Sequence, residues 1–247
     1  MRGFGKLAVM ELRLYFREPM ASFFTLIFPM MLLFLFGVIY GNKPTPFFGG
    51  LGFIDTAVPA YTAIIVGTTG LMSLTISVAA NRERGVLRRF RATPLNPLAV
   101  VGAQVVTLFI MTTLGMVLLV LAGRLIYHMR FSGNVFSVFG GFTVSCLGFF
   151  ALGFFLAGLM PNARTAQVAA MVLYYPMMFL TGAAIPREVL PQAVRKFARF
   201  LPMDPVVSLL RGLWKGDPWS AHLDNVLFLL GIAVVGSIIA AKTFRWE

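Results

Sequence analysis

Six apolar stretches, each of about membrane-spanning length, recur along the chain and are separated by short polar segments. Their approximate bounds are 21–40, 58–80, 98–122, 135–160, 168–185 and 223–241. A helix needs about 20 consecutive apolar residues to cross the hydrocarbon core of a bilayer. The pattern therefore predicts an all-α polytopic membrane protein with six transmembrane helices, organised as a single transmembrane domain over residues 1–247.

The composition agrees with this class of protein and argues against several other classes. The chain is 58% hydrophobic and 12% charged, whereas about a quarter of the residues in soluble domains are charged. Cys146 is the single cysteine and lies inside an apolar stretch, so it forms no disulfide within the chain. His128 and His222 are the two histidines, so the sequence offers no His/Cys metal cluster. We therefore expect the chain itself to bind no metal and no cofactor.

The net charge of +12 comes from Lys and Arg that flank the apolar stretches. This placement favours membrane topology and lipid headgroups, not nucleic acid, as the explanation of the charge. The short loops favour a cytoplasmic N-terminus, and six spans place the C-terminus on the same side, although the basic long segment 186–222 opposes this orientation. We expect a multi-pass protein of the plasma or inner cell membrane, with both termini cytoplasmic and membrane lipids as partners.

Residues 2–18 have the pattern of an amphipathic helix that lies on the membrane surface. At 100° per residue, its basic side chains share one narrow stripe: Arg2, Lys6, Arg13 and Arg17. Pro19 ends the helix before the first span. Glu11 and Glu18 fall on the apolar side of the wheel, which leaves two interpretations. Either both carboxylates reach water at the edge, or this face packs on protein and Glu11 meets an arginine of the segment 82–91, because a desolvated carboxylate needs such a partner.

The segment 186–222, between the fifth and sixth apolar stretches, predicts a hairpin that is half-inserted at the outer interface. Its first part has four apolar residues at helical spacing: Val194, Phe197, Ala198 and Leu201. After two prolines, residues Val206–Trp214 are apolar but far too few to span the membrane. Trp214 and Trp219 are expected at headgroup depth, where tryptophan is enriched.

Residues with catalytic or ion-coupling chemistry are missing from the predicted spans. The one Asp or Glu within the six stretches is Asp224, the second residue of the last stretch, whereas ion-coupled carriers commonly place ionisable groups in the middle of their spans. The sequence contains neither an H-E-x-x-H motif nor a G-x-x-x-x-G-K-[ST] phosphate loop. It therefore has neither the zinc-protease motif nor the phosphate-binding loop of ATPases. We predict that the chain is not an enzyme on its own.

Hydroxyl groups are the polar side chains that the second and fifth stretches do carry. Those that we consider as candidates for a substrate path are Thr68, Thr69, Ser73, Tyr174, Tyr175 and Thr181. One interpretation is helix packing, since small and hydroxyl residues are common between membrane helices. The other is a weakly polar wall along which an amphipathic substrate moves.

The segment 81–97, between the second and third apolar stretches, is the most distinctive polar part of the chain. Its charged residues are Arg82, Glu83, Arg84, Arg88, Arg89 and Arg91. A role as a topological anchor explains the arginines but not the apolar residues between them, Val86, Leu87 and Phe90. In a short helix that ends at Pro94, these three residues would form an apolar ridge. An apolar ridge among charges on an exposed helix is typical of a docking surface for a partner protein.

Together these segments resemble the membrane permeases of ABC transporters of the type-2 export class, in particular the drug-resistance permeases. Residues 83–95, Glu-Arg-Gly-Val-Leu-Arg-Arg-Phe-Arg-Ala-Thr-Pro-Leu, are similar to the cytoplasmic coupling helix of that family. Residues 11–13 and 17–19 resemble its surface helix and elbow. The prolines of the long segment resemble its outer loop, with Thr181-Gly182 where Ser-Gly is more usual. The resemblance covers essentially the whole chain.

The resemblance implies the permease subunit of an ATP-driven exporter that moves an amphipathic or lipid-linked substrate outward. It also implies a second permease subunit, identical or different, and two copies of an ABC ATP-binding subunit that hold the ATP and Mg. The docking surface would consist of Glu83, Arg84, Gly85, Val86, Leu87, Arg88, Arg89, Phe90 and Arg91. The surface helix would transmit motion through Glu11, Arg13 and Arg17. The second and fifth spans, with the six hydroxyl residues named above, would line the path.

Two other functions stay open on the residues alone. One is a secondary transporter or channel that works without ATP, and the lack of carboxylates in the middle of the predicted spans argues against it. The other is a membrane scaffold that recruits a partner but transports nothing, and the hydroxyl-bearing second span argues weakly against it. The sequence identifies neither the substrate nor whether two paired permease subunits are identical.

Overall fold

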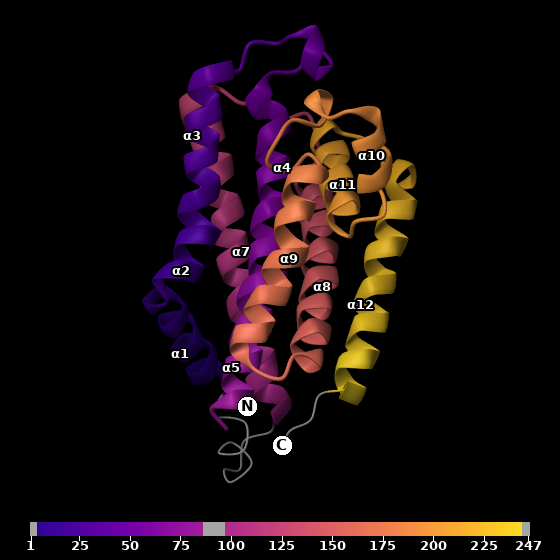
Figure 1. Cartoon of the computed structure of the whole chain (residues 1–247). Coiled ribbons are helices and arrows are strands. Elements are labelled where there is room, and N and C mark those ends of the chain that lie inside the picture. The colour runs from indigo at the N-terminus through magenta and orange to yellow at the C-terminus, as the bar shows by residue number, and fades with distance from the viewer. Residues whose placement is uncertain (1–3, 86–96, 244–247) are drawn as a thin grey trace.

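The structure, a computed structural model, describes residues 4–85 and 97–243. Within these residues the regular elements are all helices, and the long ones stand side by side in one bundle (Figure 1). Segments that are long and apolar enough to cross a membrane are Pro19–Tyr40, Pro46–Glu83, Ala99–Tyr127, Val135–Leu159 and Trp219–Ala240. The prediction of an all-α polytopic membrane protein is therefore confirmed.

The described chain begins with a separate helix that meets the first span at a bend. Helix α1 (Phe4–Arg17) lies obliquely at one end of the bundle (Figure 1). The first span follows as three consecutive helices: α2 (Pro19–Ser22), the π-helical η1 (Phe23–Ile27) and α3 (Phe28–Tyr40). The hydroxyl of Ser22 donates to the carbonyl oxygen of Tyr15 at 2.9 Å and closes the bend. The helix thus ends before Pro19, as predicted.

The second span forms the core of the bundle. After the short η2 (Pro46–Phe48), it runs through α4 (Phe53–Gly67), the π-helical η3 (Thr68–Ser73) and α5 (Leu74–Glu83). Every residue from Gly52 to Met72 is buried. The helix begins five residues before the predicted stretch 58–80, so Asp55 lies in its first turn and is buried. The prediction that this span lacks carboxylates is therefore wrong at its end.

Small residues let the remaining helices approach the core closely. The other long helices are α7 (Pro97–Tyr127), α8 (Val135–Leu159), α9 (Ala163–Leu180) and α12 (Leu223–Thr243). A Cβ atom on Gly153 of α8 would overlap the carbonyl oxygen of Gly70 in η3. A Cβ atom on Gly236 of α12 would lie 3.1 Å from the backbone of Ala151 in α8. Close approach at small residues is typical of helix packing in membranes.

Helix α9 begins and ends earlier than the predicted fifth stretch, 168–185. The side chain of Asn162 accepts a hydrogen bond from the backbone N–H of Thr165 at 2.9 Å and caps the start of the helix. Gly182, with φ +80°, follows its end. The 18 residues of α9 give a length of about 27 Å, close to the hydrocarbon thickness. Because Arg164 lowers its hydropathy, α9 is not among the five apolar segments, and the count of six spans stays a prediction.

The segment 186–222 folds back against the bundle at the end opposite α1 (Figure 1). Its helices are η4 (Arg187–Val189), α10 (Gln192–Ala198), α11 (Met203–Lys215) and η5 (Trp219–His222). Helix α11 packs against α4, α8 and α12, and ten of its residues from Met203 to Trp214 are buried. The ring of Trp214 is buried within the protein and meets Phe131 edge-on at 5.0 Å, and its expected position at headgroup depth stays a prediction. We call η4, α10 and α11 the outer hairpin.

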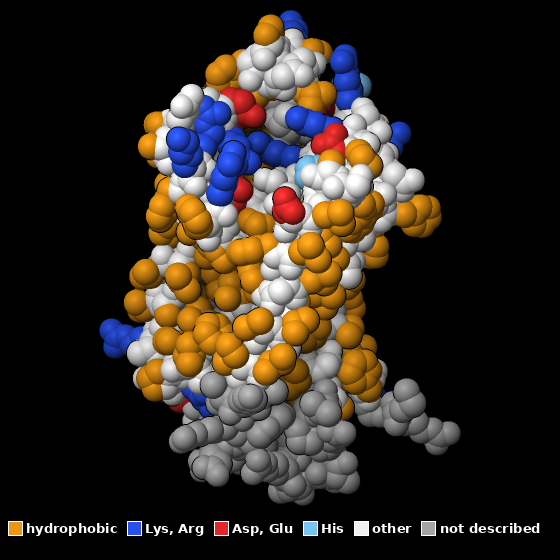
Figure 2. All heavy atoms as spheres, turned by 90° about the vertical axis from the view of Figure 1, so that its right-hand side faces the viewer, with side chains coloured by type: hydrophobic (Ala, Val, Ile, Leu, Met, Phe, Trp, Pro, Cys, Tyr) orange, Lys and Arg blue, Asp and Glu red, His pale blue; other side chains and the backbone are white. Residues whose placement is uncertain are grey.

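Apolar side chains form a belt around the middle of the bundle (Figure 2). On α12, for example, Leu227 is 64% exposed and Val234 is 58% exposed. Above the belt, Figure 2 shows Lys and Arg side chains gathered around the outer hairpin. A belt of exposed apolar residues is the surface that lipid covers in a membrane protein.

Candidate functional site at the arginine-rich end of the bundle

The predicted docking segment lies only in part within the described residues. Glu83 ends α5, and Arg84 and Gly85 follow it. Outside the described residues lie Val86, Leu87, Arg88, Arg89, Phe90 and Arg91. The end of α5 and the start of α7 lie at the same end of the bundle as α1 and the end of α12 (Figure 1). We call this the docking end.

Two charged side chains connect the end of α5 to the turn between α8 and α9. The guanidinium of Arg82 donates to the carbonyl oxygens of Gly158 and Met160, at the end of α8. The carboxylate of Glu83 accepts a hydrogen bond from the backbone N–H of Ala163, the first residue of α9, at 2.9 Å. A cation at a helix C-terminus and an anion at a helix N-terminus both complement the helix dipole. Glu83, predicted as a docking residue, is therefore also committed to a contact within the chain.

Helix α1 is bound to three other elements. The buried hydroxyl of Tyr15 lies 2.7 Å from the hydroxyl of Thr25 in the first span and 3.5 Å from that of Ser73 in the second. The hydroxyl of Thr107 in α7 donates to the carbonyl oxygen of Ala8 at 3.3 Å. Helix α1 is therefore connected by hydrogen bonds to the first and second spans and to α7.

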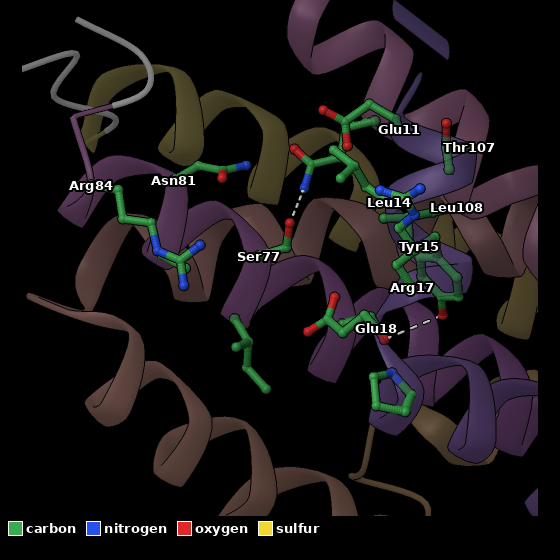
Figure 3. A pocket seen from close by; sticks show the side chains of 15 residues that line it. Glu11, Leu14, Tyr15, Arg17, Glu18, Ser77, Asn81, Arg84, Thr107 and Leu108 are labelled. Atoms are coloured by element: carbon green, nitrogen blue, oxygen red, sulfur yellow. Dashed lines mark hydrogen bonds between the residues drawn. The ribbon is translucent and has the colours of Figure 1, made fainter. Parts of the chain in front are cut away.

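A polar cavity of about 460 Å³ lies between α1, α5 and α7 at the docking end (Figure 3). Its polar and charged lining residues are Glu11, Tyr15, Arg17, Glu18, Ser73, Ser77, Asn81, Arg84, Gln104 and Thr107. The amide of Gln104 donates to the hydroxyl of Ser77, labelled in Figure 3, at 2.8 Å across the wall of the cavity. The cavity therefore brings the predicted surface helix and the first residues of the predicted docking segment to one place.

The surroundings of Glu11 agree only in part with each of the two interpretations drawn from the sequence. Its carboxylate is half-buried, because the face of α1 that bears it turns toward protein, and this burial raises the pKa of Glu11. Arg84 lines the same cavity (Figure 3), but within the described residues the two side chains form no ion pair. Of the other two predicted coupling residues, Arg17 lines the cavity and Arg13 does not, and both side chains are exposed.

Most of the hydroxyl residues considered for a substrate path form hydrogen bonds within the chain. The hydroxyl of Tyr174 lies 2.7 Å from that of Thr68, and the hydroxyl of Thr112 donates to that of Thr69 at 2.9 Å. Thr181 is buried and donates to a carbonyl oxygen of its own helix. Ser73 lines the cavity, and Tyr175 is partly exposed. These contacts support the packing interpretation, and the substrate path stays a prediction.

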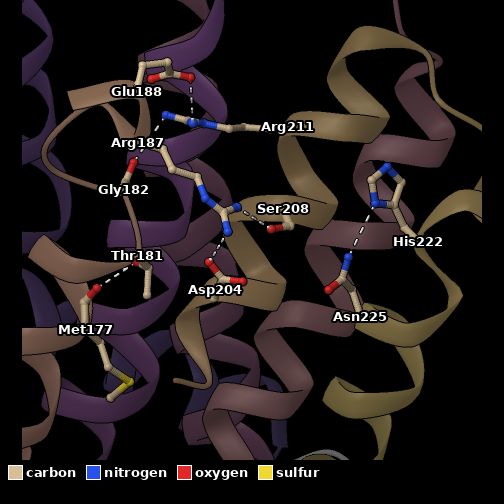
Figure 4. Close-up of polar contacts among 10 residues, drawn as sticks. All are labelled: Met177, Thr181, Gly182, Arg187, Glu188, Asp204, Ser208, Arg211, His222 and Asn225. Carbon is tan, nitrogen blue, oxygen red and sulfur yellow. Dashed lines mark hydrogen bonds and ion pairs between the residues drawn. The ribbon is translucent and has the colours of Figure 1, made fainter. Parts of the chain in front are cut away.

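An ionic network under the outer hairpin was not predicted from the sequence (Figure 4). Arg187 pairs with Asp204 at 3.1 Å and donates to the hydroxyl of Ser208 at 3.2 Å. Arg211 donates to the carbonyl oxygen of Gly182 at 3.2 Å and lies 3.8 Å from a carboxylate oxygen of Glu188. The sequence did contain a signal for this network, because Asp204 and Arg211 interrupt an otherwise apolar stretch. The network anchors the hairpin to the end of α9.

Asp55 joins three segments at the same end as the outer hairpin. Its carboxylate accepts hydrogen bonds from the side chain of Asn42 at 2.9 Å, from the backbone N–H of Gly52 at 3.0 Å and from that of Arg130 at 2.8 Å. A carboxylate with three donors is satisfied by the protein, which indicates a structural role. Within residues 4–85 and 97–243, no group of three or more His, Cys, Asp or Glu side chains fits a metal ion.

Comparison with known proteins identifies the family. The family model for ABC-2 type transporters matches residues 3–214. The chain belongs to this family. Among curated proteins it is similar to the Bacillus subtilis "Putative transport permease YvfS", with 25% identity over 244 residues, which cover 96% of each protein.

Two relatives from Escherichia coli K12 are longer proteins. The chain is 23% identical to the "Probable multidrug ABC transporter permease YbhS" over 180 residues, which cover 72% of the chain and 48% of that protein. It is 21% identical to the "Inner membrane transport permease YhhJ" over 212 residues, which cover 83% of the chain and 53% of that protein. The chain thus spans about half the length of these two relatives. Membership of the ABC-2 family implies, in general, an ATP-binding partner and a dimeric arrangement.

Proposed function

We propose that this chain is the transmembrane subunit of an ATP-driven exporter. A separate ATP-binding subunit docks on residues 83–91, and its movement drives an amphipathic or lipid-linked substrate outward. The ATP and Mg are held by that subunit, two copies of which act on a pair of permease subunits in the plasma or inner cell membrane. Family membership supports this assignment, as does the absence of a phosphate loop from the sequence.

The observation that carries the proposal is the way in which the docking end is connected to the spans. A push on the segment after α5 acts on Arg82 and Glu83, and through them on the facing ends of α8 and α9. A push on α1 acts through Tyr15 on the first and second spans. Both routes consist of hydrogen bonds between separate helices, whose defined geometry would let them transmit displacement.

This mechanism requires the docking end to face the cytoplasm. The arginines of residues 81–97 then obey the enrichment of positive charge in cytoplasmic loops, and the described ends of α1 and α12 lie on the same side (Figure 1). The basic residues around the outer hairpin, such as Arg187 and Arg211, belong to one long segment. These residues count against the orientation, but the Lys and Arg assigned to the docking side of the membrane outnumber those assigned to the other side.

The test is to purify the chain together with its ATP-binding subunit and to reconstitute both in liposomes. Reversal of Arg88 and Arg89 to Glu should reduce co-purification and ATP-dependent transport together, because like charges would then face the partner's acidic groups. Reversal of Arg195 and Lys196, on α10 at the opposite end, is the matched control and should leave co-purification unchanged. Transport by the permease alone, without ATP, would establish a secondary transporter or channel instead. Intact complexes that move nothing would establish a scaffold.

A further inference from the structure

An apolar groove of about 360 Å³ lies on the outside of the bundle, between α7 and α8. Its walls come from the last turns of α7, including Val117 and Val120, and from the first turns of α8, including Val138 and Phe139. These turns lie at the end of the bundle opposite the docking end (Figure 1). The groove is therefore separate from the polar cavity described above.

Two polar groups border this apolar groove. Arg124 lies three residues before the end of α7, about 5 Å along the helix axis, and its side chain is exposed. Among the described residues, its guanidinium has no hydrogen-bond or ion-pair partner. Trp214 of α11 also lines the groove and is 5% exposed, and its indole N–H is buried without an acceptor. A buried donor without an acceptor is costly, so the site is incomplete as the chain alone forms it.

The residues around the groove indicate which class of molecule could bind in it. Both α7 and α8 are long and apolar enough to span a membrane, and the exposed residues beside the groove, Val135 and Phe136, are 67% and 87% exposed. These residues form part of the surface that lipid covers. The occupant must supply an apolar chain for the groove, an acceptor for an N–H group, and a negative charge beside a guanidinium near the helix end.

We propose that the groove between α7 and α8 is a binding site for one glycerophospholipid, which belongs to the outer leaflet if the docking end faces the cytoplasm as in the proposed function. An acyl chain fills the groove, and the phosphate binds Arg124, whose position near the end of α7 corresponds to headgroup depth. An ester carbonyl oxygen accepts the hydrogen bond from Trp214. Because Trp214 belongs to α11, the lipid also holds the outer hairpin against α7 and α8.

The test uses the full chain in detergent and measures retained lipid by native mass spectrometry. The probes are phosphatidylglycerol and a diacylglycerol with the same acyl chains but no phosphate. The parent protein should retain one phosphatidylglycerol per chain. Arg124→Gln should lower that affinity about tenfold, as expected for loss of a charge-assisted hydrogen bond, and should leave the weaker binding of diacylglycerol unchanged. Arg130→Gln, which removes an exposed arginine outside the groove, is the matched control and should bind like the parent.

A second variant tests the groove itself. Val120→Trp places a large side chain in the groove and should displace phosphatidylglycerol while Arg124 remains. If this variant does not fold, the comparison of Arg124→Gln with Arg130→Gln decides alone. Equal loss of binding in both arginine variants, or equal retention in both, would overturn the site, because the attraction would then be general. A change of oligomeric state in Arg124→Gln without a change in lipid would assign the groove to a second copy of the chain and overturn the proposal.

Discussion

The ion pair between Arg187 and Asp204 should anchor the outer hairpin and contribute measurably to the stability of the fold. Arg187 lies in η4 and Asp204 in the first turn of α11, so the pair closes the hairpin on itself. The two charged atoms are 3.1 Å apart, and the side chains are 26% and 9% exposed. Removal of either partner leaves the other charge poorly solvated. We therefore expect a loss of stability that depends on the presence of both.

The burial of the two side chains determines how much stability is lost when the ion pair is broken. Breaking a fully buried pair costs about 3–5 kcal/mol, whereas an exposed pair is worth about 0.2–1 kcal/mol. Asp204 is nearly buried but Arg187 is a quarter exposed, so Arg187→Gln and Asp204→Asn should each cost about 2–3 kcal/mol. For a chain of this length that corresponds to a fall in Tm of about 5–10 °C. The double variant should cost about 2–3 kcal/mol, no more than either single variant, because it leaves no unpaired charge.

The assay is thermal unfolding of the four proteins of this double-mutant cycle, followed by tryptophan fluorescence. Trp214 is a suitable reporter because it is buried in α11, eleven residues after Met203, the first residue of that helix. The coupling energy should be about 2–3 kcal/mol, well above the limit of about 0.5 kcal/mol that independent sites show. Strict additivity of the two single losses would refute the reasoning, as would single variants that unfold at the temperature of the parent.

Three further predictions concern the docking end and the core. Glu83→Gln should lower stability by about 0.5–1 kcal/mol, because the N–H of Ala163 loses a charged acceptor, but the ATP-binding subunit should still co-purify. Tyr174→Phe should lower Tm by about 2–4 °C through the lost contact with Thr68 and leave the range of transported substrates unchanged. Glu11→Gln should raise Tm at neutral pH. Burial raises the pKa of Glu11 above its unfolded value, so ionisation of this group costs stability above the folded pKa, and the advantage of Gln should vanish as the pH falls below about 4.

Each of these predictions has an outcome that contradicts it. Loss of the ATP-binding subunit from Glu83→Gln, with unchanged Tm, would mean that this carboxylate serves docking and not α9. A changed substrate range in Tyr174→Phe would support the substrate path over the packing interpretation. A Tm difference for Glu11→Gln that is the same at all pH values would show that the charge of this carboxylate is not the cause.

Helix existence was predictable, but several helix ends were not. The length of the apolar stretches is enough to predict membrane helices, yet α4 and α9 both begin five residues before their predicted stretches. In both cases a polar side chain stabilises the start of the helix. The carboxylate of Asp55 accepts a hydrogen bond from the N–H of Gly52, and the side chain of Asn162 accepts one from the N–H of Thr165. A search for apolar stretches assigns such polar residues to the loops, so it places the start of the helix too late. Their capping chemistry is the local signal that would have moved the boundaries.

The contacts of polar side chains within the bundle depend on distant parts of the chain. Tyr174 meets Thr68 across 106 positions of sequence, and Glu83 meets Ala163 across 80. Neither spacing has a local signature, so the sequence could suggest that these residues matter but not what they bind. The same holds for Arg187, which the sequence presented only as one basic residue of a long segment.

Site-specific photo-crosslinking tests the central claim most directly. A photoreactive residue replaces Arg88 in one variant and Arg130, at the opposite end of the bundle, in another, and each is expressed with the ATP-binding subunit in intact cells. The account predicts a covalent adduct with that subunit from position 88 and none from position 130. An adduct from position 130, or none from position 88 while the complex is assembled, would contradict it.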